Sequence, residues 1–429
     1  KVIIIASCSF QGQTTIPSQL ALNEALAEAE HKPQACVIVQ RATCPAQLLP
    51  ERDHDFHTLE QSAPAEPVML RSEDPLYILH TSGTTGHAKG IVRDNGGHAV
   101  ALALSMELIY GCEPGDTFFT TSDLGWVVGH SYGVYAPLLS GCTSVIVEGG
   151  ASASAIRALC HEHEVKCLFT TPTQMRLMRQ ESRNLSGAIL PALARIFVAG
   201  EYADPTLLEW ARSYFCKPVV NHWWQTETGW SITAHFFGLP EREPVALMND
   251  IGRPAPGFRP EIMLSIPGEQ CGEIVLSLPL PPGCLAGVWK DGAIHVPAAY
   301  LDETGQYYRT FDEGMIEASR AVHMLGRSDD VIKVAGRRIS GVQIEKIIAA
   351  HPEVHACAVV ATPDELRGQR PVAYVVPNSG VEGRPSSEEI IGRVNHALGR
   401  WIGLKEVRFV KHLPTTVSGK ITRKRLLVS

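Results

Sequence analysis

The sequence has no uninterrupted apolar run that approaches the ~20 residues a membrane-spanning helix needs, so we expect no membrane partner. It has no basic excess either: 38 lysines and arginines face 45 acidic residues, and the formal net charge is -7. Phosphate backbones bind basic surfaces, so this balance argues against a nucleic-acid partner. The eleven cysteines form no C-x-x-C pair, and their scatter favours reduced thiols over a disulfide framework.

What is present is an ordinary globular composition, with 45% hydrophobic and 19% charged residues over 429 positions, which excludes disorder as the main state. At roughly 100–200 residues per domain, this length predicts two to four domains or subdomains. The chain begins at Lys1 without a methionine, inside an apolar run typical of a core strand. We therefore expect a fragment that lacks an N-terminal part. The reduced thiols favour an intracellular protein, in the cytoplasm or alternatively in the mitochondrial matrix.

Short apolar runs alternate with amphipathic stretches, a pattern typical of α/β layers in which helices cover sheets. The predicted strands are Val2–Ala6, Cys36–Gln40, Tyr77–Leu79, Ser144–Val147, Cys167–Phe169, Arg195–Val198 and Pro218–Asn221. The predicted helices are Pro17–His31, Gly96–Tyr110, Ser152–Glu164, Thr173–Glu181 and Pro205–Tyr214.

The second half of the chain changes character. Residues from about 251 to 326 are rich in β formers and turn residues, and they predict a β-rich subdomain. The pattern then predicts a compact α+β unit with helices Val342–His351 and Ser387–Trp401 and strands Val354–Ala361, Pro371–Val376 and Glu406–Val410. We expect a large N-terminal domain over residues 1–326 and a small, mobile C-terminal domain over residues 327–429.

One cluster of metal-ligating residue types invites comparison with a zinc site: Cys160, His161, His163 and Cys167. Structural zinc sites usually show tighter paired spacings than these four residues do. We therefore expect the end of a helix followed by the strand Cys167–Phe169.

A loop rich in glycine and hydroxyl residues follows the strand Tyr77–Leu79. Its residues are Thr81, Ser82, Gly83, Thr84, Thr85, Gly86, His87, Ala88, Lys89 and Gly90. Glycines let backbone N–H groups approach a polyphosphate, and the hydroxyls and Lys89 add donors and charge. The spacing does not fit the P-loop pattern G-x-x-x-x-G-K-[ST], which disfavours an ATPase of that class. A mobile surface loop is the plain alternative for such a composition.

This loop resembles the signature of the adenylate-forming superfamily, which includes acyl-CoA synthetases, luciferases and peptide-synthetase adenylation domains. Further motifs resemble the family in the same order along nearly the whole chain. The resemblance implies a luciferase-like α/β domain of several subdomains, with layered sheets and helices, and a small C-terminal α+β domain. It also implies the small-molecule partners ATP, coenzyme A and a carboxylate, together with Mg²⁺. The loop from Thr81 to Lys89 would then bind ATP.

Two further motifs resemble the nucleotide pocket of the family. Val198–Glu201 resembles the segment that lines adenine. Asn221–Gly229 is more specific, because its two adjacent tryptophans would face opposite sides of a strand and both need apolar surroundings. The resemblance gives Thr226 the α-phosphate and Glu227 the magnesium ion. It assigns further ATP contacts to Gly200, Glu201, Asn221, His222, Trp223 and Gln225.

Tyr307–Asp312 resembles the motif whose aspartate binds the ribose hydroxyls, which gives that role to Asp312. Gly326–Asp330 resembles the junction before the small domain. There the resemblance places Arg327 on ribose or phosphate and makes Asp329 the hinge, since hinges lie at the ends of elements.

The last two motifs belong to the small domain. Val334–Arg338 implies that Ala335 and Gly336 line the path of the coenzyme A thiol and that Arg338 faces phosphate. Pro414–Lys420 resembles the terminal loop whose lysine, here Lys420, stabilises charge as pyrophosphate leaves. The basic residues that follow are expected on a solvated face: Arg423, Lys424 and Arg425. Three positions depart from the usual family residues: Tyr202, Asn221 and Phe311, the last where glycine is usual.

The resemblance also indicates a short acyl chain. Trp224 matches the bulky residue that closes the acyl pocket in short-chain enzymes, and Asp123–Tyr132 resembles the same type. Val128 and Ala199 favour propionate, because acetate enzymes tend to carry threonine and valine there. Acetate stays the alternative, since one methylene discriminates by only ~1–3 kcal/mol. The expected acyl pocket consists of Trp126, Val127, Val128, Ala199 and Trp224.

Two other functional classes stay open. A catalytically silent nucleotide-binding protein or fragment would bind ATP without releasing pyrophosphate. An adenylation domain that feeds a carrier protein would need a downstream carrier segment.

Overall fold

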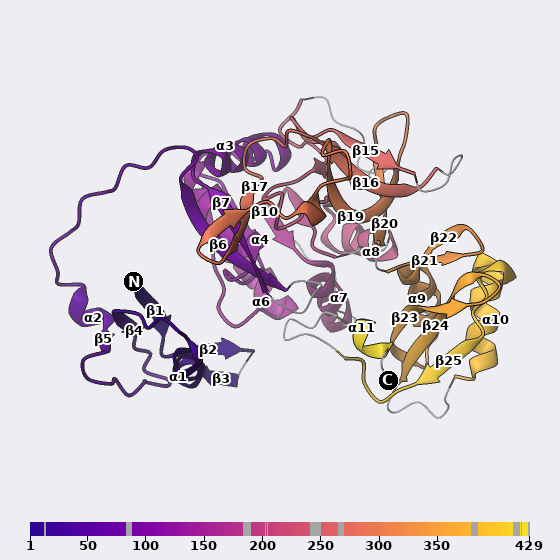
Figure 1. The fold of residues 1–429 in the computed structure, drawn as a ribbon, viewed down its shortest axis with the longest axis horizontal. Coiled ribbons are helices and arrows are strands. Elements are labelled where there is room, and N and C mark those ends of the chain that lie inside the picture. The colour runs from indigo at the N-terminus through magenta and orange to yellow at the C-terminus, as the bar shows by residue number, and fades with distance from the viewer. Residues whose placement is uncertain are drawn as a thin grey trace. The chain divides into compact units, whose positions relative to one another are not determined.

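The computed structural model describes residues 1–12, 14–82, 88–182, 190–201, 203, 205–240, 250–264, 270–328, 330–378, 385–414, 421 and 423–427. The chain forms two compact units (Figure 1). One contains Lys1–Asn249 and Pro282–His295, and the other contains Asp250–Pro281 and Val296–Ser429. No helix in these described ranges is both long enough and apolar enough to cross a bilayer.

The first unit contains a parallel sheet of five strands in the order β12-β11-β10-β8-β9. These strands are β8 (Thr117–Thr120), β9 (Thr143–Val145), β10 (Val165–Thr170), β11 (Arg195–Val198) and β12 (Val219–Asn221). Successive residues of a strand face opposite sides. Leu168 and Ile196 accordingly pack into a core with three helices, whereas Phe169 and Phe197 contact Tyr110 on the other face. Burial on both faces explains why these strands are nearly continuous apolar runs.

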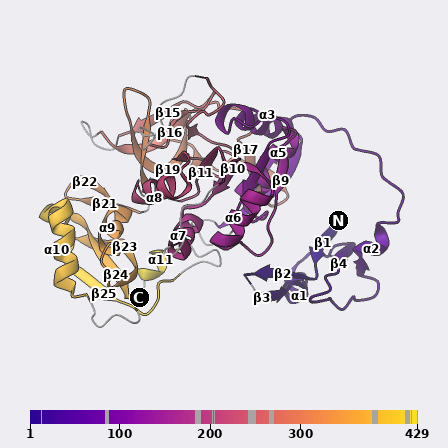
Figure 2. The ribbon, with the colours of Figure 1, turned by 180° about the vertical axis from the view of Figure 1, so that it is seen from behind.

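The helices of that core are α6 (Ala153–Glu162), α7 (Pro172–Glu181) and α8 (Pro205–Phe215). Figure 2 shows α6 beside β10 and α5 (Ala136–Leu139) beside β9. The side chains of Ser152 and Thr171 accept hydrogen bonds from backbone N–H groups of α6 and α7. Such N-caps satisfy donors that a helix start leaves without partners, and so fix where each helix begins.

An antiparallel sheet in the order β18-β17-β7-β6 lies in the same unit. Its strands are β6 (Pro75–Ser82), β7 (Ala88–Asp94), β17 (Leu285–Lys290) and β18 (Ala293–His295). Helix α3 (Gly96–Leu104) follows β7 and continues as the π-helix η1 (Ser105–Ile109). Helix α4 (Val127–His130) likewise continues as the π-helix η2 (Ser131–Tyr135). Strand pairing across almost 200 residues therefore joins β7 to β17.

The first residues of the chain form a small parallel sheet in the order β1-β4-β5. Leu22 and Leu26 of α1 pack against Cys36 and Ile38 of this sheet. The elements are β1 (Val2–Ala6), β2 (Cys8–Gln11), β3 (Thr14–Pro17), α1 (Ser18–Glu28), β4 (Ala35–Val39), β5 (Asp53–Asp55) and α2 (Phe56–Leu59).

The second unit holds two further sheets, with strand orders β15-β16-β19-β20 and β22-β21-β24-β23, and β25 pairs with β24. The first comprises β15 (Pro260–Met263), β16 (Gly272–Ser277), β19 (Tyr307–Ile316) and β20 (Val322–Arg327). The second comprises β21 (Val331–Val334), β22 (Arg337–Ser340), β23 (Val354–Asp364), β24 (Gly368–Pro377) and β25 (Glu406–Phe409). Helices α9 (Gly341–Ala349) and α10 (Ser387–Leu398) cover it, and α11 (Arg423–Leu426) lies near the chain end. Short elements complete the chain: β13 (Thr233–Ala234), β14 (Arg253–Pro254), η5 (Ala298–Tyr300) and η6 (Arg400–Ile402).

The predicted α/β class is confirmed, with layered sheets and helices followed by a small α+β part. The predicted helix Gly96–Tyr110 is an α-helix that widens into a π-helix. Contacts group most of the β-rich segment with the C-terminal residues in one unit, whereas Pro282–His295 belongs to the other unit. The functional boundary between residues 326 and 327 stays a prediction.

Candidate functional site

The carboxyl ends of four parallel strands lie along one edge of the central sheet. Thr121 follows β8 and donates to or accepts from Thr170 at the end of β10, with 2.8 Å between the hydroxyl oxygens. Val198 at the end of β11 pairs with Asn221 at the end of β12. Open α/β sheets bind ligands at this edge. The topology thus brings the predicted segments 199–201 and 221–225 side by side.

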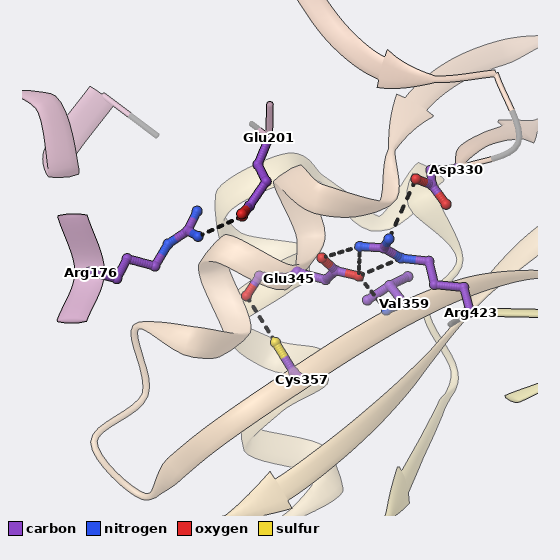
Figure 3. A network of polar contacts seen from close by, with 7 residues as sticks. All are labelled: Arg176, Glu201, Asp330, Glu345, Cys357, Val359 and Arg423. Carbon is purple, nitrogen blue, oxygen red and sulfur yellow. Dashed lines mark hydrogen bonds and ion pairs between the residues drawn. The ribbon is translucent and has the colours of Figure 1, made fainter. Parts of the chain in front are cut away.

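The turn after β11 is fixed by helix α7. Thr173 Oγ1 donates to Glu201 Oε2 at 2.7 Å, and Arg176 Nη1 lies 3.3 Å from the same oxygen (Figure 3). The N-terminus of a helix attracts negative charge, so the position of α7 suits a carboxylate. Gly200 has φ +93°, which glycine adopts without a steric cost. The predicted adenine-binding segment is therefore a defined turn with an anchored acid.

The imidazole of His222 faces the core. Its Nδ1 lies 3.0 Å from the carbonyl oxygen of Val198, so Nδ1 carries the proton, and Nε2 accepts from the Tyr110 hydroxyl at 3.0 Å. Burial lowers the pKa of His222 to about 3, which keeps the ring neutral. Because the ring is 2% exposed, any contact with ATP falls to the main chain of His222.

Tyr132 links the two halves of the predicted acyl pocket. It lies on the helical segment that begins after Trp126, and its ring meets the Trp224 ring edge-on at 5.5 Å. Trp224, Val128 and Ala199 are buried, Val127 is half-buried, and Trp126 is exposed. Trp223 exchanges backbone hydrogen bonds with Thr233. Both adjacent tryptophans are buried, each with 8% of its surface exposed.

Residues 225–229 form a tight turn, called here the Thr-Glu turn. The hydroxyl of Thr228 accepts from the backbone N–H of Gln225 at 3.1 Å and lies 3.1 Å from the carbonyl oxygens of Gln225 and Trp230. Thr226 and Glu227 are half-buried within this turn. Hydroxyl and carboxylate side chains are thereby held next to each other on a closed backbone.

Arg93, a fully buried side chain of β7, holds the Thr-Glu turn. Its Nη2 donates to the carbonyl oxygen of Thr226, and its Nη1 donates to the carbonyls of Glu227 at 3.3 Å and Gly283 at 2.6 Å. Leu285, which pairs with Arg93 across the sheet, donates its N–H to the same Glu227 carbonyl at 2.7 Å. Hydrogen bonds from a charged donor contribute about 1.5–3 kcal/mol each. Arg93 was not among the predicted site residues.

Gly229 shows how closely this arrangement is packed. Its φ is +75°, and a Cβ atom there would lie 2.4 Å from the Gly283 carbonyl oxygen and 2.6 Å from Arg93 Cζ. Both the backbone conformation and the close approach require glycine. The glycine of the motif thus makes room for the arginine that fixes the turn.

The predicted phosphate loop is described only at its ends. Thr81 at the end of β6 pairs with Lys89 at the start of β7, and Ser82 pairs with Ala88, so the loop closes a β-hairpin. The predicted ATP-binding residues Gly83, Thr84, Thr85 and Gly86 lie outside the described residues, and only the main chain of Ser82 is described. The hairpin leads directly along β7 to Arg93.

The predicted ribose-binding pair comes together in the second unit. Arg327 Nη1 lies 3.3 Å from Asp312 Oδ1 and donates to the Thr310 carbonyl at 3.1 Å. The Asp312 carboxylate is nearly buried, whereas the Arg327 guanidinium is partly exposed. Each carboxylate oxygen accepts more than one hydrogen bond, so a carboxylate in this position suits the predicted contact with ribose hydroxyls.

A β-bulge explains how Asp312 is aimed. Ile274 on β16 pairs with Asp312 and the next residue, Val275, pairs with Arg309, so Thr310 and Phe311 are extra residues of β19. Phe311 has φ +58°, a left-handed conformation that favours glycine, the usual residue of the family at this position. The departure noted in the sequence therefore falls where it strains the backbone.

The predicted coenzyme A residues form a two-residue hairpin turn between β21 and β22. Ala335 has φ +49° and Gly336 has φ +79°, as in a type I′ turn, and Val334 pairs with Arg337 across it. Arg338 lies in β22, where only its main chain is described. Neither Asp329 nor Lys420 is among the described residues.

One expectation at the chain end is wrong. Arg423, expected on a solvated face, has a side chain only 20% exposed and is paired with Glu345 and Asp330. Arg425 is exposed as expected, and the side chain of Lys424 is not described. The sequence around Arg423 could not reveal these ion-pair partners, because both carboxylates are far away in the sequence.

The helix end and the strand expected around Cys160 are confirmed, since α6 ends at Glu162 and β10 contains Cys167. Burial raises the pKa of Cys160 to about 12, which opposes the thiolate a metal needs. No group of three metal-ligating side chains converges anywhere in the described part of the chain. Mg²⁺ commonly binds one or two carboxylates and completes its shell with water and substrate phosphates, so a single Glu227 fits that mode.

Comparison with known proteins agrees with this arrangement. The family described as AMP-binding enzyme matches residues 1–281, and the AMP-binding enzyme C-terminal domain matches residues 343–420. The human acyl-CoA synthetase short-chain family member 3, mitochondrial, is 40% identical over 99% of this chain and 64% of its own length. The propionate–CoA ligase of Salmonella typhimurium is 35% identical over 99% of this chain and 70% of its own length.

Among solved structures, the crystal structure of Brucella canis acyl-CoA synthetase is similar with a TM-score of 0.65 at 28% identity, covering 99% of this chain and 74% of that chain. The chain spans about two thirds of the length of the curated relatives it matches. Since the first family match covers more than half of the sequence, the chain belongs to the AMP-binding enzyme family.

Proposed function

We propose that this protein is an AMP-forming acid–thiol ligase, a short-chain acyl-CoA synthetase that prefers propionate. It activates the acid with ATP as an acyl-adenylate, releases pyrophosphate, and passes the acyl group to coenzyme A. The family match and the names of the similar ligases support the reaction class. The preference for propionate is the finer part of the proposal.

The observation that carries the proposal is the hold of Arg93 on the Thr-Glu turn. The strand that contains Arg93 begins directly after the glycine-rich loop. Two segments more than 130 residues apart in the sequence, each suited to phosphate, are thus parts of one packed sheet and turn. The hydrogen bonds of Arg93 to Thr226, Glu227 and Gly283 all go to main-chain carbonyls, so they leave the Thr226 hydroxyl and the Glu227 carboxylate to other partners.

In the first step a carboxylate oxygen forms a bond to the α-phosphorus, and the bond from that phosphorus to the bridging oxygen breaks as pyrophosphate leaves. Thr226 donates a hydrogen bond from its hydroxyl to the α-phosphate, and Lys420, beside the α-phosphate, stabilises charge as pyrophosphate leaves. Asp312 accepts from the ribose hydroxyls, with Arg327 beside it. Positioning and charge neutralisation suffice, because the carboxylate itself is the nucleophile.

Mg²⁺ is the implied metal, and Glu227 would hold it. When bound, the ion supplies charge neutralisation to the phosphates. The Thr-Glu turn holds the backbone of Glu227 next to that of Thr226, which suits a metal-binding carboxylate beside a phosphate-binding hydroxyl.

In the second step the thiol of coenzyme A attacks the acyl carbon and AMP leaves. We assign the path of the thiol to the turn Ala335–Gly336 and a phosphate contact to Arg338. The domain over residues 327–429 turns about Asp329 between the steps. A type I′ turn presents backbone N–H groups on a short rigid hairpin, which suits this role.

The acid preference rests on two side chains. Trp224, held by Tyr132, closes the pocket to long chains. Ala199 is fully buried at the end of β11, so a valine there would fill space with two more methyl groups. One methylene changes selectivity by about 1–3 kcal/mol, or roughly 10–200-fold.

The test compares acetate, propionate and butyrate with the whole protein, measuring pyrophosphate release and thioester formation. Propionate should give the highest kcat/KM. Ala199→Val should move the preference toward acetate by at least about 10-fold. Ala192→Val, the same change at an exposed position before the same strand, is the matched control and should keep the wild-type preference.

Failure would be unambiguous. ATP binding without pyrophosphate release for any acid would favour the silent nucleotide-binding protein. Equal kcat/KM for all three acids would remove the pocket argument while leaving the ligase assignment intact.

A further inference from the structure

A largely buried ion cluster in the second unit joins Arg423 to two carboxylates that lie 78 and 93 residues earlier in the chain (Figure 3). Arg423 Nη2 lies 2.9 Å from each carboxylate oxygen of Glu345, and its Nε lies 3.2 Å from Oε1. Arg423 Nη1 lies 3.4 Å from Asp330 Oδ2. Figure 3 shows the guanidinium between the two carboxylates. We call Arg423, Glu345 and Asp330 the terminal cluster.

Glu345 is held from several sides. Besides Arg423, its carboxylate accepts from the backbone N–H of Val359 at 2.7 Å. Its carbonyl oxygen accepts from the Cys357 thiol at 3.2 Å, so main chain and side chain are both tied to β23. The side chains of Glu345 and Arg423 are only 13% and 20% exposed. The contacts with β23 therefore hold the Glu345 carboxylate in place independently of Arg423.

The terminal cluster lies close in the sequence to the predicted adenylation lysine and to the predicted hinge residue. Arg423 comes three residues after Lys420, and Asp330 comes directly after Asp329. Ile421, the residue after Lys420, packs with Leu426 against an apolar cluster formed by β23 and β24. The chain is thus held immediately after the lysine by an apolar contact and again at Arg423 by charge.

The apolar contacts alone already attach the chain end. Leu426 is buried, and its carbonyl accepts from the Tyr374 hydroxyl at 2.6 Å. Burying an ion pair is costly, and an apolar side chain of similar size often serves stability as well or better. The ion pair between Arg423 and Glu345 adds a fixed geometry. Several N–H groups of the planar guanidinium bind one held carboxylate, and this restricts the orientation of the backbone near residue 423.

We propose that Arg423 is a positioning residue for adenylation, which holds the terminal segment so that Lys420 reaches the α-phosphate in the first step. The inference rests on the proposed function and on the role of Lys420 there. Asp330 shares the same guanidinium, so the anchor of the lysine and the chain beside the hinge residue are held by one group. Thioester formation does not use Lys420 and should be spared when the cluster is weakened.

The test separates the two half-reactions in the whole protein. Adenylation is followed by pyrophosphate release without coenzyme A, and thioester formation is followed from supplied propionyl-AMP and coenzyme A. Arg423→Lys keeps the charge and loses the fork, and Glu345→Gln keeps the shape and loses the charge. Arg425→Lys makes the same chemical change at an exposed position two residues away and is the matched control.

Both cluster variants should lose between about 10-fold and 100-fold in adenylation kcat, the usual effect of misplacing a catalytic group by up to 1 Å. Their KM for ATP and their rate from propionyl-AMP should stay within twofold of wild type, as should every rate of Arg425→Lys. Equal losses in both half-reactions would show a merely structural role and overturn the proposal, as would unchanged adenylation. A wild-type protein that performs neither half-reaction would instead overturn the proposed function itself.

Discussion

Phe311 sits in a left-handed backbone conformation with φ +58°, inside the bulge that aims Asp312. Replacing it with glycine or with alanine removes the same ring, which lies over the guanidinium carbons of Arg309 at 5.0 Å and Arg327 at 5.9 Å. The two variants therefore share the loss of these contacts, about 0.5–1 kcal/mol each. They differ in the backbone, because the left-handed conformation costs alanine about 1–2 kcal/mol and glycine nothing.

Glycine also has more freedom in the unfolded chain, which costs it about 0.5–1 kcal/mol relative to alanine. The glycine variant should accordingly be more stable than the alanine variant by about 0.75 kcal/mol, the difference between the midpoints of these two ranges. Urea unfolding followed by circular dichroism measures this difference, provided both variants show the same m-value. At the exposed strand position Lys333 the same pair of substitutions should give the opposite order. If alanine equals or exceeds glycine at position 311, the backbone there is not left-handed and the account of the bulge is refuted.

Three further predictions concern the first unit. Arg93→Lys should lower the free energy of unfolding by about 2–4 kcal/mol, because an ammonium cannot satisfy three carbonyls in the arginine geometry, and a wild-type thermal midpoint would contradict the role given to Arg93. Gly229→Ala should cost about 2–5 kcal/mol, since its Cβ would lie 2.4 Å from a carbonyl oxygen. Gly292→Ala, with φ +80° and open space around it, should cost only about 1–2 kcal/mol, and equal midpoints for the two variants would remove the packing argument. Burial lowers the pKa values of His98 and His222 to about 3, so both rings are neutral when folded and bind protons on unfolding as the pH falls. The contribution of these two rings should be full above about pH 6.5 and should decline as the pH falls, by up to about 2.7 kcal/mol per pH unit for the pair, and His98→Gln should remove about half of that contribution.

The fold was predictable where short apolar runs mark buried strands. The runs Cys167–Phe169 and Arg195–Val198 both lie in the central parallel sheet, whose two covered faces demand such sequences. Strands β17 and β18 were not predicted, because β17 pairs with β7 almost 200 residues earlier and its own sequence carries no turn or alternation signal for that partner. Distant pairing of this kind is set by the assembled sheet.

The motifs of the candidate site could be predicted from the sequence, but the residues that hold these motifs in place could not. The roles proposed for Thr226 and Glu227 belong to their side chains, which a sequence motif can reveal. Arg93 binds main-chain carbonyls, which every residue has, so nothing in the sequence marks its acceptors. Arg423 was misjudged because a basic run is typical of a solvated face, whereas its partner Glu345 lies 78 residues away. The roles of the nucleotide-binding and acyl-pocket residues stay predictions.

The hold of Arg93 on the Thr-Glu turn has a consequence for motion. Opening that turn would strand a guanidinium inside the protein, so the turn cannot loosen unless β7 also leaves its sheet. Its amide hydrogens should then exchange with solvent as slowly as those of the sheet interior. Any flexibility that the proposed reaction needs must therefore come from other segments, and the Thr-Glu turn would act as a fixed reference against which they move.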